Sequence, residues 1–166
     1  MTFRITSTLL TTLLFFVFSC QSPTPPPTEE TTTENAADLT YDSLKAQQYG
    51  ADDYGMKKYV FAFLKRGPSP EQDSTKAADL QAAHMANIKH MAAEGQLVLA
   101  GPFFGNDSLR GIYLFNVQTI AEAEALTATD PLIQSGGLVM DMKEWYGSAA
   151  LMAVSGLHEE ISKIKM

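Results

Sequence analysis

Residues 57–65 (KKYVFAFLK) constrain the fold most strongly, because their side chains are apolar in both phases of a strand. Successive side chains of a β-strand point to opposite faces of the sheet, so each phase marks one face. One phase is aromatic and the other aliphatic, namely Tyr59, Phe61 and Phe63 against Val60, Ala62 and Leu64. A strand of this kind must be covered on both faces. The chain therefore has to place other layers on both sides of a sheet.

The segments that follow show a mixture of helical and strand patterns. Apolar residues spaced three and four positions apart predict a helix over residues 74–94, which Gly95 ends. Thr119 with Glu122 three residues later forms a capping box, which predicts a second helix over 119–129. Three further segments are predicted to be strands, and they lie at 96–100, 111–117 and 138–145.

The predicted order is that of a ferredoxin-like α+β domain, βαββαβ, with a four-stranded antiparallel sheet and two helices on one face. We expect this domain to occupy residues 56–148. Residues 38–55 are expected to form a partly helical extension, and residues 149–166 a C-terminal helical tail. The second face of the sheet still needs a cover. A second copy of the sheet is the simplest one, so we expect a homodimer.

The first 19 residues are typical of an export signal. Arg4 supplies positive charge, and the apolar run that follows is too short to span a bilayer as a helix, which takes roughly 20 residues. The end of this run, Val17-Phe18-Ser19-Cys20, resembles the lipobox of bacterial lipoproteins, in which the cysteine is lipidated. Residues 20–37 are rich in Pro, Thr and Glu, which predicts a disordered linker.

We therefore expect an exported protein that is lipid-anchored through Cys20 to a membrane of the cell envelope, on its periplasmic or outer side. The alternative is an ordinary cleavable signal peptide that happens to be followed by a cysteine. Cys20 is the single cysteine of the chain, so no internal disulfide can hold the fold.

Charge and residue spacing exclude other classes of function. The formal net charge is −7. Most of it arises in residues 21–55, which carry seven acidic side chains and one lysine. The rest of the chain has no clustered basic stripe, so nucleic acid is not an expected partner. No grouping of His, Cys, Asp or Glu has the spacing of metal ligands, and we expect neither a metal nor a cofactor.

His84 is the first residue that could carry chemistry. It lies on the apolar stripe of the first predicted helix, between Leu80 and Ile88, and therefore faces the sheet. Imidazole titrates near neutral pH, which suits it to general acid/base work. A core histidine that is satisfied by a backbone or side-chain partner fits the same spacing, and the spacing alone favours that interpretation.

Asp130 is the second such residue, and it also has two interpretations. It precedes Pro131, so it can cap a short helix that begins at the proline. It can instead accept a hydrogen bond from His84, orienting the ring and supporting its charge during proton transfer. The sequence does not place the two residues within reach of each other.

Several short motifs occur in the order and spacing of the YCII family. They are His84 in the first helix, GQLVLAGP at 95–102, Asp130-Pro131-Leu132 followed by Ser135-Gly136, and Trp145-Tyr146-Gly147-Ser148. Residues 57–148 therefore resemble this family. The resemblance implies a ferredoxin-like fold, dimers of the dimeric α/β-barrel kind, and a His–Asp pair in a pocket, which would be His84 and Asp130. The export signal, linker, extension and tail depart from the family pattern.

A relative within that family is associated with dehydrochlorination of a chlorinated aromatic. We therefore expect a cofactor-independent lyase or isomerase acting on a small molecule, with His84 as general acid/base and Asp130 as its orienter. Gly101 and Pro102 are expected to shape the pocket wall where the backbone must approach closely. Two alternatives stay open: a small-molecule binding module without turnover, and an envelope interaction module in which His84 is simply buried.

Overall fold

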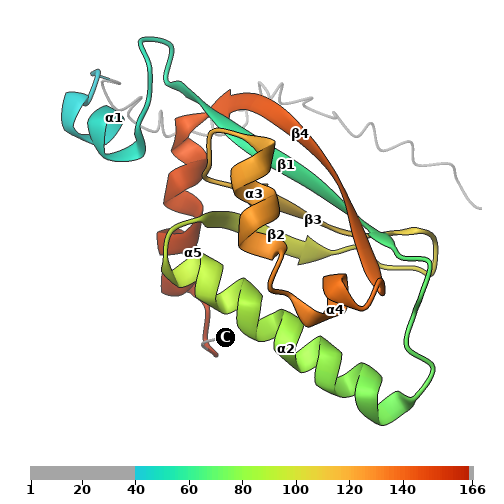
Figure 1. The fold of residues 1–166 in the computed structure, drawn as a ribbon. Helices are drawn as coiled ribbons and strands as arrows, with labels where there is room; N and C mark the ends of the chain where they lie inside the picture. The colour runs from blue at the N-terminus through green and yellow to red at the C-terminus, as the bar shows by residue number, and fades with distance from the viewer. Residues whose placement is uncertain (1–39, 165–166) are drawn as a thin grey trace, which may run out of the picture. The chain divides into compact units, whose positions relative to one another are not determined.

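A four-stranded antiparallel sheet forms the centre of residues 40–164, the part of the chain that the computed structural model describes (Figure 1). Its strands are β1 (Met56–Arg66), β2 (Leu97–Pro102), β3 (Leu109–Phe115) and β4 (Leu138–Ser148). They lie in the order β2-β3-β1-β4, and all neighbours are antiparallel. This order is ferredoxin-like, so the predicted α+β fold class is confirmed. The predicted signal peptide (1–19), Cys20 and the predicted linker (20–37) lie outside the described residues.

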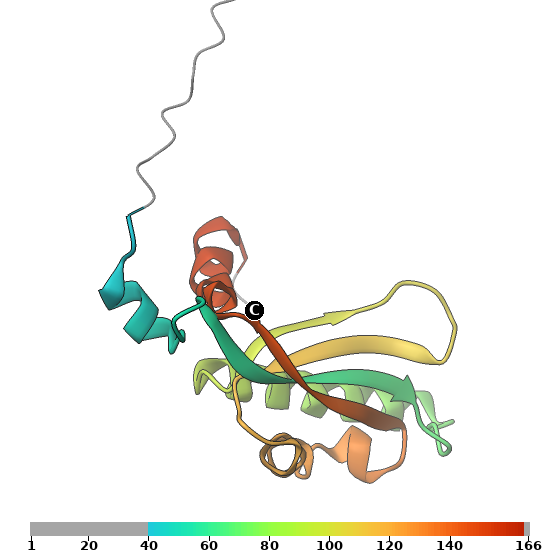
Figure 2. The same ribbon diagram turned by 90° about the horizontal axis from the view of Figure 1, so that it is seen from above.

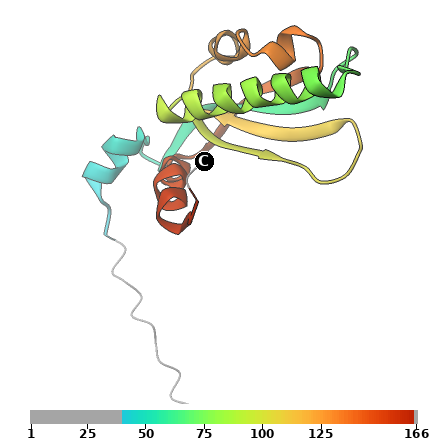
Figure 3. The ribbon, with the colours of Figure 1, turned by 90° about the horizontal axis from the view of Figure 1, so that it is seen from below.

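Three helices cover one face of the sheet (Figure 3), namely α2 (Ser74–Ala93), α3 (Ile120–Thr127) and α4 (Pro131–Gln134). The side chain of Asp73 caps α2 by accepting the backbone N–H groups of Thr75 and Lys76. The predicted capping box at Thr119 is present at the start of α3. The segment predicted as one helix over 119–129 thus ends at Thr127, and a second short helix follows at Pro131.

The core on the helix side is built on the aliphatic phase of β1. Val60 and Ala62 are completely buried there. Val60 pairs with Phe115 of β3, and Ala62 pairs with Tyr113. Directly paired residues share a face of the sheet, so both rings point toward the helices, where they join a cluster that includes Met91 of α2. Through Tyr113, this cluster reaches His84 of α2.

The C-terminal segment covers one end of the opposite face (Figure 2), through the 3₁₀ helix η1 (Ala149–Ala153) and α5 (Val154–Ile161). Leu151 and Met152 pack against a buried cluster on that face, formed by Tyr59, Val98 and Leu114. The Ser155 hydroxyl donates to the carbonyl of Val98 at 3.2 Å. The tail therefore supplies part of the cover that the aromatic phase of β1 requires.

The rest of that face has no cover within the described chain, and we call Phe61, Phe63 and Trp145 the open face. Phe61 and Phe63 are half-buried, and Trp145 keeps 40% of its surface exposed. The ring of Phe61 lies 5.0 Å from that of Phe63 and 6.2 Å from that of Trp145, measured between centroids. The open face is where a second copy is expected, and the homodimer stays a prediction.

The extension before the sheet is helical over α1 (Ser43–Tyr49). Asp42 caps its start by accepting the backbone N–H of Lys45, and Gly50 ends it in the left-handed conformation, with φ of 68°. Residues 51–55 form a turn that is held by the carboxylate of Asp52. None of the helices in residues 40–164 is long and apolar enough to cross a membrane.

Candidate functional site

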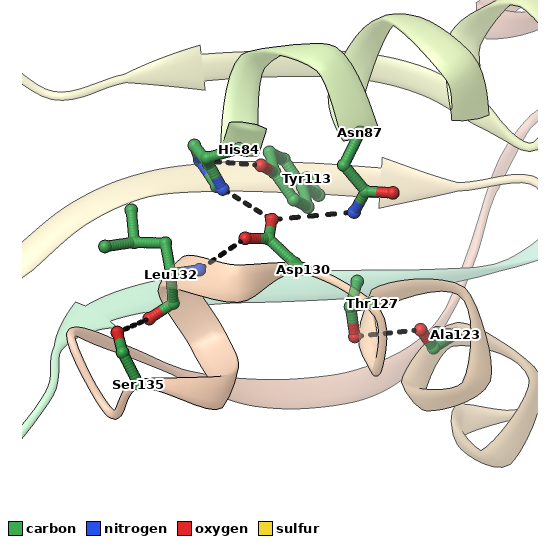
Figure 4. A network of polar contacts seen from close by, with 8 residues as sticks. All are labelled: His84, Asn87, Tyr113, Ala123, Thr127, Asp130, Leu132 and Ser135. Atoms are coloured by element: carbon green, nitrogen blue, oxygen red, sulfur yellow. Dashed lines mark hydrogen bonds and ion pairs between the residues drawn. The ribbon is translucent and has the colours of Figure 1, made fainter. Parts of the chain in front are cut away.

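The structure places the two predicted site residues in direct contact (Figure 4). His84 on α2 and Asp130 before α4 are joined by a distance of 2.6 Å between Nδ1 and Oδ2. Both residues are buried, with 6% of His84 and 1% of Asp130 exposed. Two residues 46 positions apart in the chain thus form one site. Their catalytic role stays a prediction.

Asp130 uses its two carboxylate oxygens for different partners. Oδ1 accepts the backbone N–H of Leu132 at 2.9 Å and caps α4, while Oδ2 faces His84. The side-chain amide of Asn87 lies at 3.5 Å from the same Oδ2, a weak contact from the next turn of α2. Both interpretations of Asp130 therefore hold together, because the helix cap fixes the carboxylate in the position from which it meets the ring.

The electrostatics of the pair favour an ionised carboxylate. Burial raises the pKa of Asp130. The hydrogen bond from His84, the charge of His84 and the backbone N–H of Leu132 lower it by a larger amount, so the net result is a lowered pKa. An ionised carboxylate has no proton to donate, so the proton in this contact lies on Nδ1 of the imidazole. Nε2 is then the nitrogen that carries the lone pair when the ring is neutral.

Tyr113 of β3 occupies the other side of the ring. Its hydroxyl oxygen is 3.1 Å from Nε2 of His84, and the two rings are stacked with 6.2 Å between centroids and 21° between planes. Only 2% of Tyr113 is exposed. Burial, with a smaller contribution from the charge of Asp130, raises the pKa of Tyr113, so the phenol keeps its proton at neutral pH. Within residues 40–164, both ring nitrogens of His84 thus have partners.

Sequence reasoning did not single out Tyr113, although a signal existed. In the predicted strand 111–117, Tyr113 shares its phase with Phe115, which places both on one face. That phase is the helix side, but neither the register of β3 against β1 nor the reach of the ring toward α2 is encoded in the strand itself. The contact becomes visible only when Ala62, which pairs with Tyr113, is known to lie beneath the helices.

Gly101 and Pro102, predicted as part of the pocket wall, end the edge strand β2. A Cβ built at Gly101 would meet nothing within 4 Å in the described chain, so packing within the chain does not require a glycine there. The close backbone approach lies at Gly111 of β3 instead, where a Cβ would come within 2.6 Å of the carbonyl oxygen of Gly101. A role of either residue in a pocket stays a prediction.

Two cavities in the described part of the chain lie away from the pair. One, of about 340 Å³, is an open pocket lined by residues of α3, α4 and β4, and one of about 240 Å³ lies between α1 and the C-terminal segment. Neither His84 nor Asp130 lines them, although Thr127 and Ile133, which bracket Asp130 in the chain, line the first. Among residues 40–164, no group of three or more His, Cys, Asp or Glu side chains is arranged to hold a metal ion.

Comparison with known proteins places this site in a family. A family model described as a YCII-related domain matches residues 60–146, which run from β1 into β4 and contain both His84 and Asp130. This chain belongs to the YCII-related domain family. The resemblance of the short motifs to that family is thereby confirmed.

Two similar proteins extend the comparison of this YCII-related domain. The uncharacterized protein YjpA of Bacillus subtilis (strain 168) is 33% identical over 64 residues, which are 39% of this chain and 73% of that protein. Among solved structures, 5-chloro-2-hydroxyhydroquinone dehydrochlorinase (TftG) from Burkholderia phenoliruptrix AC1100, in complex with 2,5-dihydroxybenzoquinone, is similar with a TM-score of 0.41 and 18% identity. That similarity covers 54% of this chain and 93% of the other.

Proposed function

We propose that this YCII-related protein is a cofactor-independent acid/base enzyme, of the lyase or isomerase type, that acts on a small molecule. His84 takes up and returns the proton, and Asp130 orients the ring and supports its charge. The observation that carries the proposal is the 2.6 Å contact between His84 Nδ1 and Asp130 Oδ2 in a buried site. Gly101 and Pro102 remain the proposed wall of the substrate pocket.

The chemistry follows from the proton on Nδ1. In the neutral ring, Nδ1–H donates to the carboxylate and Nε2 keeps a lone pair, which makes Nε2 the base. When Nε2 removes a proton from a substrate carbon or hydroxyl, the ring becomes positive and Asp130 stabilises that charge. Return of the proton to another substrate atom completes an isomerisation, whereas its delivery to a departing group completes an elimination. Neither outcome needs an oxidant or a reductant.

The proposal is tested by titrating the His84 ring by NMR in the wild type and in Asp130→Asn. Asparagine also caps helices well, so α4 is expected to persist in this variant. Loss of the carboxylate charge removes support for the protonated ring, and the titration midpoint of His84 is expected to fall by about one pH unit or more. The matched control is Asp141→Asn, because Asp141 binds Lys65 and Lys143 on the other face and does not contact His84. An unchanged midpoint in Asp130→Asn would show that the two residues do not act as a pair.

A second candidate is a module without turnover, in which the pair stabilises the fold or borders a binding site. It is favoured by the same burial, because His84 is 6% exposed and both of its nitrogens have partners within the chain. Crystals of the purified protein separate a ligand site from a purely structural role. Density for a co-purified small molecule beside His84 is expected for an enzyme or a binding module, whereas its absence together with a clear loss of stability in His84→Gln would favour the buried structural role.

We further propose that the protein is exported and lipid-anchored to a membrane of the cell envelope through Cys20, with residues 20–37 as the linker. The support is the short apolar run that ends in Val17-Phe18-Ser19-Cys20. The full-length protein is expected in the membrane fraction, and Cys20→Ala is expected in the soluble fraction. Ser22→Ala is the control that should stay with the membrane, and membrane retention of Cys20→Ala would contradict the anchor.

A further inference from the structure

Packing of the core explains the aromatic ring of Tyr113 but does not explain its hydroxyl group. The ring fills the core between β3 and α2, where it meets Phe115 edge-on at 5.5 Å, and a phenylalanine could fill the same space. Alanines flank it on both neighbouring strands, Ala62 on β1 and Ala100 on β2, so the ring has room to stand upright toward α2. The oxygen at its end lies 3.1 Å from Nε2 of His84.

We propose that Tyr113 is a positioning residue of the His84 site, binding Nε2 as Asp130 binds Nδ1, so that the imidazole has a partner on both sides in either protonation state. This inference rests on the proposed acid/base role of His84. Tyr113 acts through His84. Its hydroxyl holds Nε2 while no substrate is bound, and a substrate would exchange its proton with Nε2 by displacing that hydroxyl.

A phenol suits this position because it can both donate and accept a hydrogen bond. When the ring is neutral, the hydroxyl donates to the lone pair of Nε2. When the ring is charged, Nε2–H donates to the phenol oxygen instead. The raised pKa of Tyr113 keeps its proton in place, so the hydroxyl serves both states without becoming an anion.

The surroundings give the ring few other partners. The titratable groups that meet it are Asp130, from the turn before α4, and Tyr113, from β3. The nearest polar side chain on its own helix is the uncharged Asn87, which lies beside Asp130. The paired residues beside Tyr113 on β1 and β2 are alanines. With 6% of His84 exposed, water is a poor substitute for the lost hydroxyl.

These contacts predict the sign of the effect of removing the hydroxyl. In Tyr113→Phe, the neutral ring loses a partner for a lone pair, whereas the charged ring leaves a buried, positively charged N–H without an acceptor. The second loss costs more, because unsatisfied charged groups are penalised more heavily than neutral ones. The proton affinity of His84 is therefore expected to fall, and its titration midpoint to move down by about one pH unit.

The experiment is a ¹⁵N NMR titration of the His84 ring in the wild type, Tyr113→Phe, Asp130→Asn and Tyr59→Phe. Tyr59 is the matched control, since it is completely buried and its hydroxyl binds the carbonyl of Ser148 on the opposite face. We expect Tyr113→Phe to lower the midpoint and Tyr59→Phe to leave it unchanged. If Tyr113→Phe titrates as the wild type does while Asp130→Asn is shifted, the Tyr113 inference is overturned and the His84–Asp130 pair stands. If neither variant shifts the midpoint, both proposals fail.

A measurement on the wild type keeps the inference testable if Tyr113→Phe does not fold. The phenolic proton of Tyr113 is expected to exchange slowly with water and to show a cross-peak to the His84 ring when that ring is neutral. A hydroxyl proton that exchanges as fast as that of the exposed Tyr41 would overturn the inference.

Discussion

A single carboxylate connects secondary structure to chemistry at this site. Oδ1 of Asp130 caps α4, and Oδ2 meets His84. The cap restricts the rotamers of the side chain, so the second oxygen reaches the ring with little further loss of conformational freedom. At the residue scale, the capping role and the pairing role therefore support each other, although sequence patterns treat them as alternatives.

Asp130 is expected to make the stability of the fold depend on pH in the acid range. Its pKa is lowered in the folded chain, so its contribution is fully present above the ordinary aspartate value of about 3.9 and is lost as the pH falls toward the lowered folded value. Urea unfolding between pH 7 and pH 2.5 should therefore show a stability difference between the wild type and Asp130→Asn that shrinks below about pH 4.

Asp141→Asn gives the contrast for this measurement. The pKa of Asp141 is also lowered, by Lys65 and Lys143, so the sign of its pH dependence is the same. The side chain of Asp141 is 42% exposed, and solvent screens the charges of such pairs. Its effect on the free energy of unfolding should therefore be much smaller than that of Asp130. Equal effects from the two variants would contradict the special position of Asp130.

At the element scale, the approach of β2 to β3 depends on one glycine. A Cβ at Gly111 would lie 2.6 Å from the carbonyl oxygen of Gly101 and 3.3 Å from the Cα of Pro102. Gly111→Ala must therefore push the two strands apart, and we expect it to destabilise the fold by about 1–3 kcal/mol. Gly101→Ala is the matched control in the same strand pair, because its Cβ meets nothing within 4 Å. Thermal unfolding gives the melting temperatures of the two variants, and that of Gly111→Ala should be the lower. Equal melting temperatures would refute the close approach of the two strands at Gly111.

The order and type of the elements could be predicted from local patterns, but several ends could not. The last strand was expected over 138–145, whereas β4 continues to Ser148 because residues 146–148 pair with residues 56–58 of β1. The position where β4 ends is determined by its pairing with β1. The alternation of apolar and polar residues within β4 does not predict it. The strand expected over 111–117 likewise lies at Leu109–Phe115, where β1 and β2 supply its partners.

The site shows the same division between local and tertiary information. The apolar stripe of α2 identified His84, and the Asp-Pro step identified Asp130 as a helix cap, because both signals lie within a few residues. Their contact depends on how α2 lies against the turn before α4, and the contact with Tyr113 depends on strand register. Neither contact can be predicted from the periodicity of a single helix or strand.

At the scale of the molecule, the two faces of β1 are covered by different parts of the chain. The helices bury its aliphatic phase, and the C-terminal segment buries Tyr59 at one end of the aromatic phase. Phe61, Phe63 and Trp145 of the open face are left partly exposed. A cluster of large aromatic side chains on a sheet face is typical of an interaction surface. We propose that a second copy of the chain covers it, as the two-faced pattern of β1 predicts.

The homodimer is tested by the mass of the protein in solution. The wild type is expected to sediment with the mass of two chains, and Phe63→Glu with the mass of one, because the variant would place a second carboxylate directly opposite Asp141 and bury its charge between the two sheets. Phe104→Glu is the matched control, since Phe104 is fully exposed on the β2–β3 loop and lies outside the open face. It should remain dimeric. A wild type with the mass of one chain at micromolar concentration would contradict the proposal, and the open face would then need a different partner.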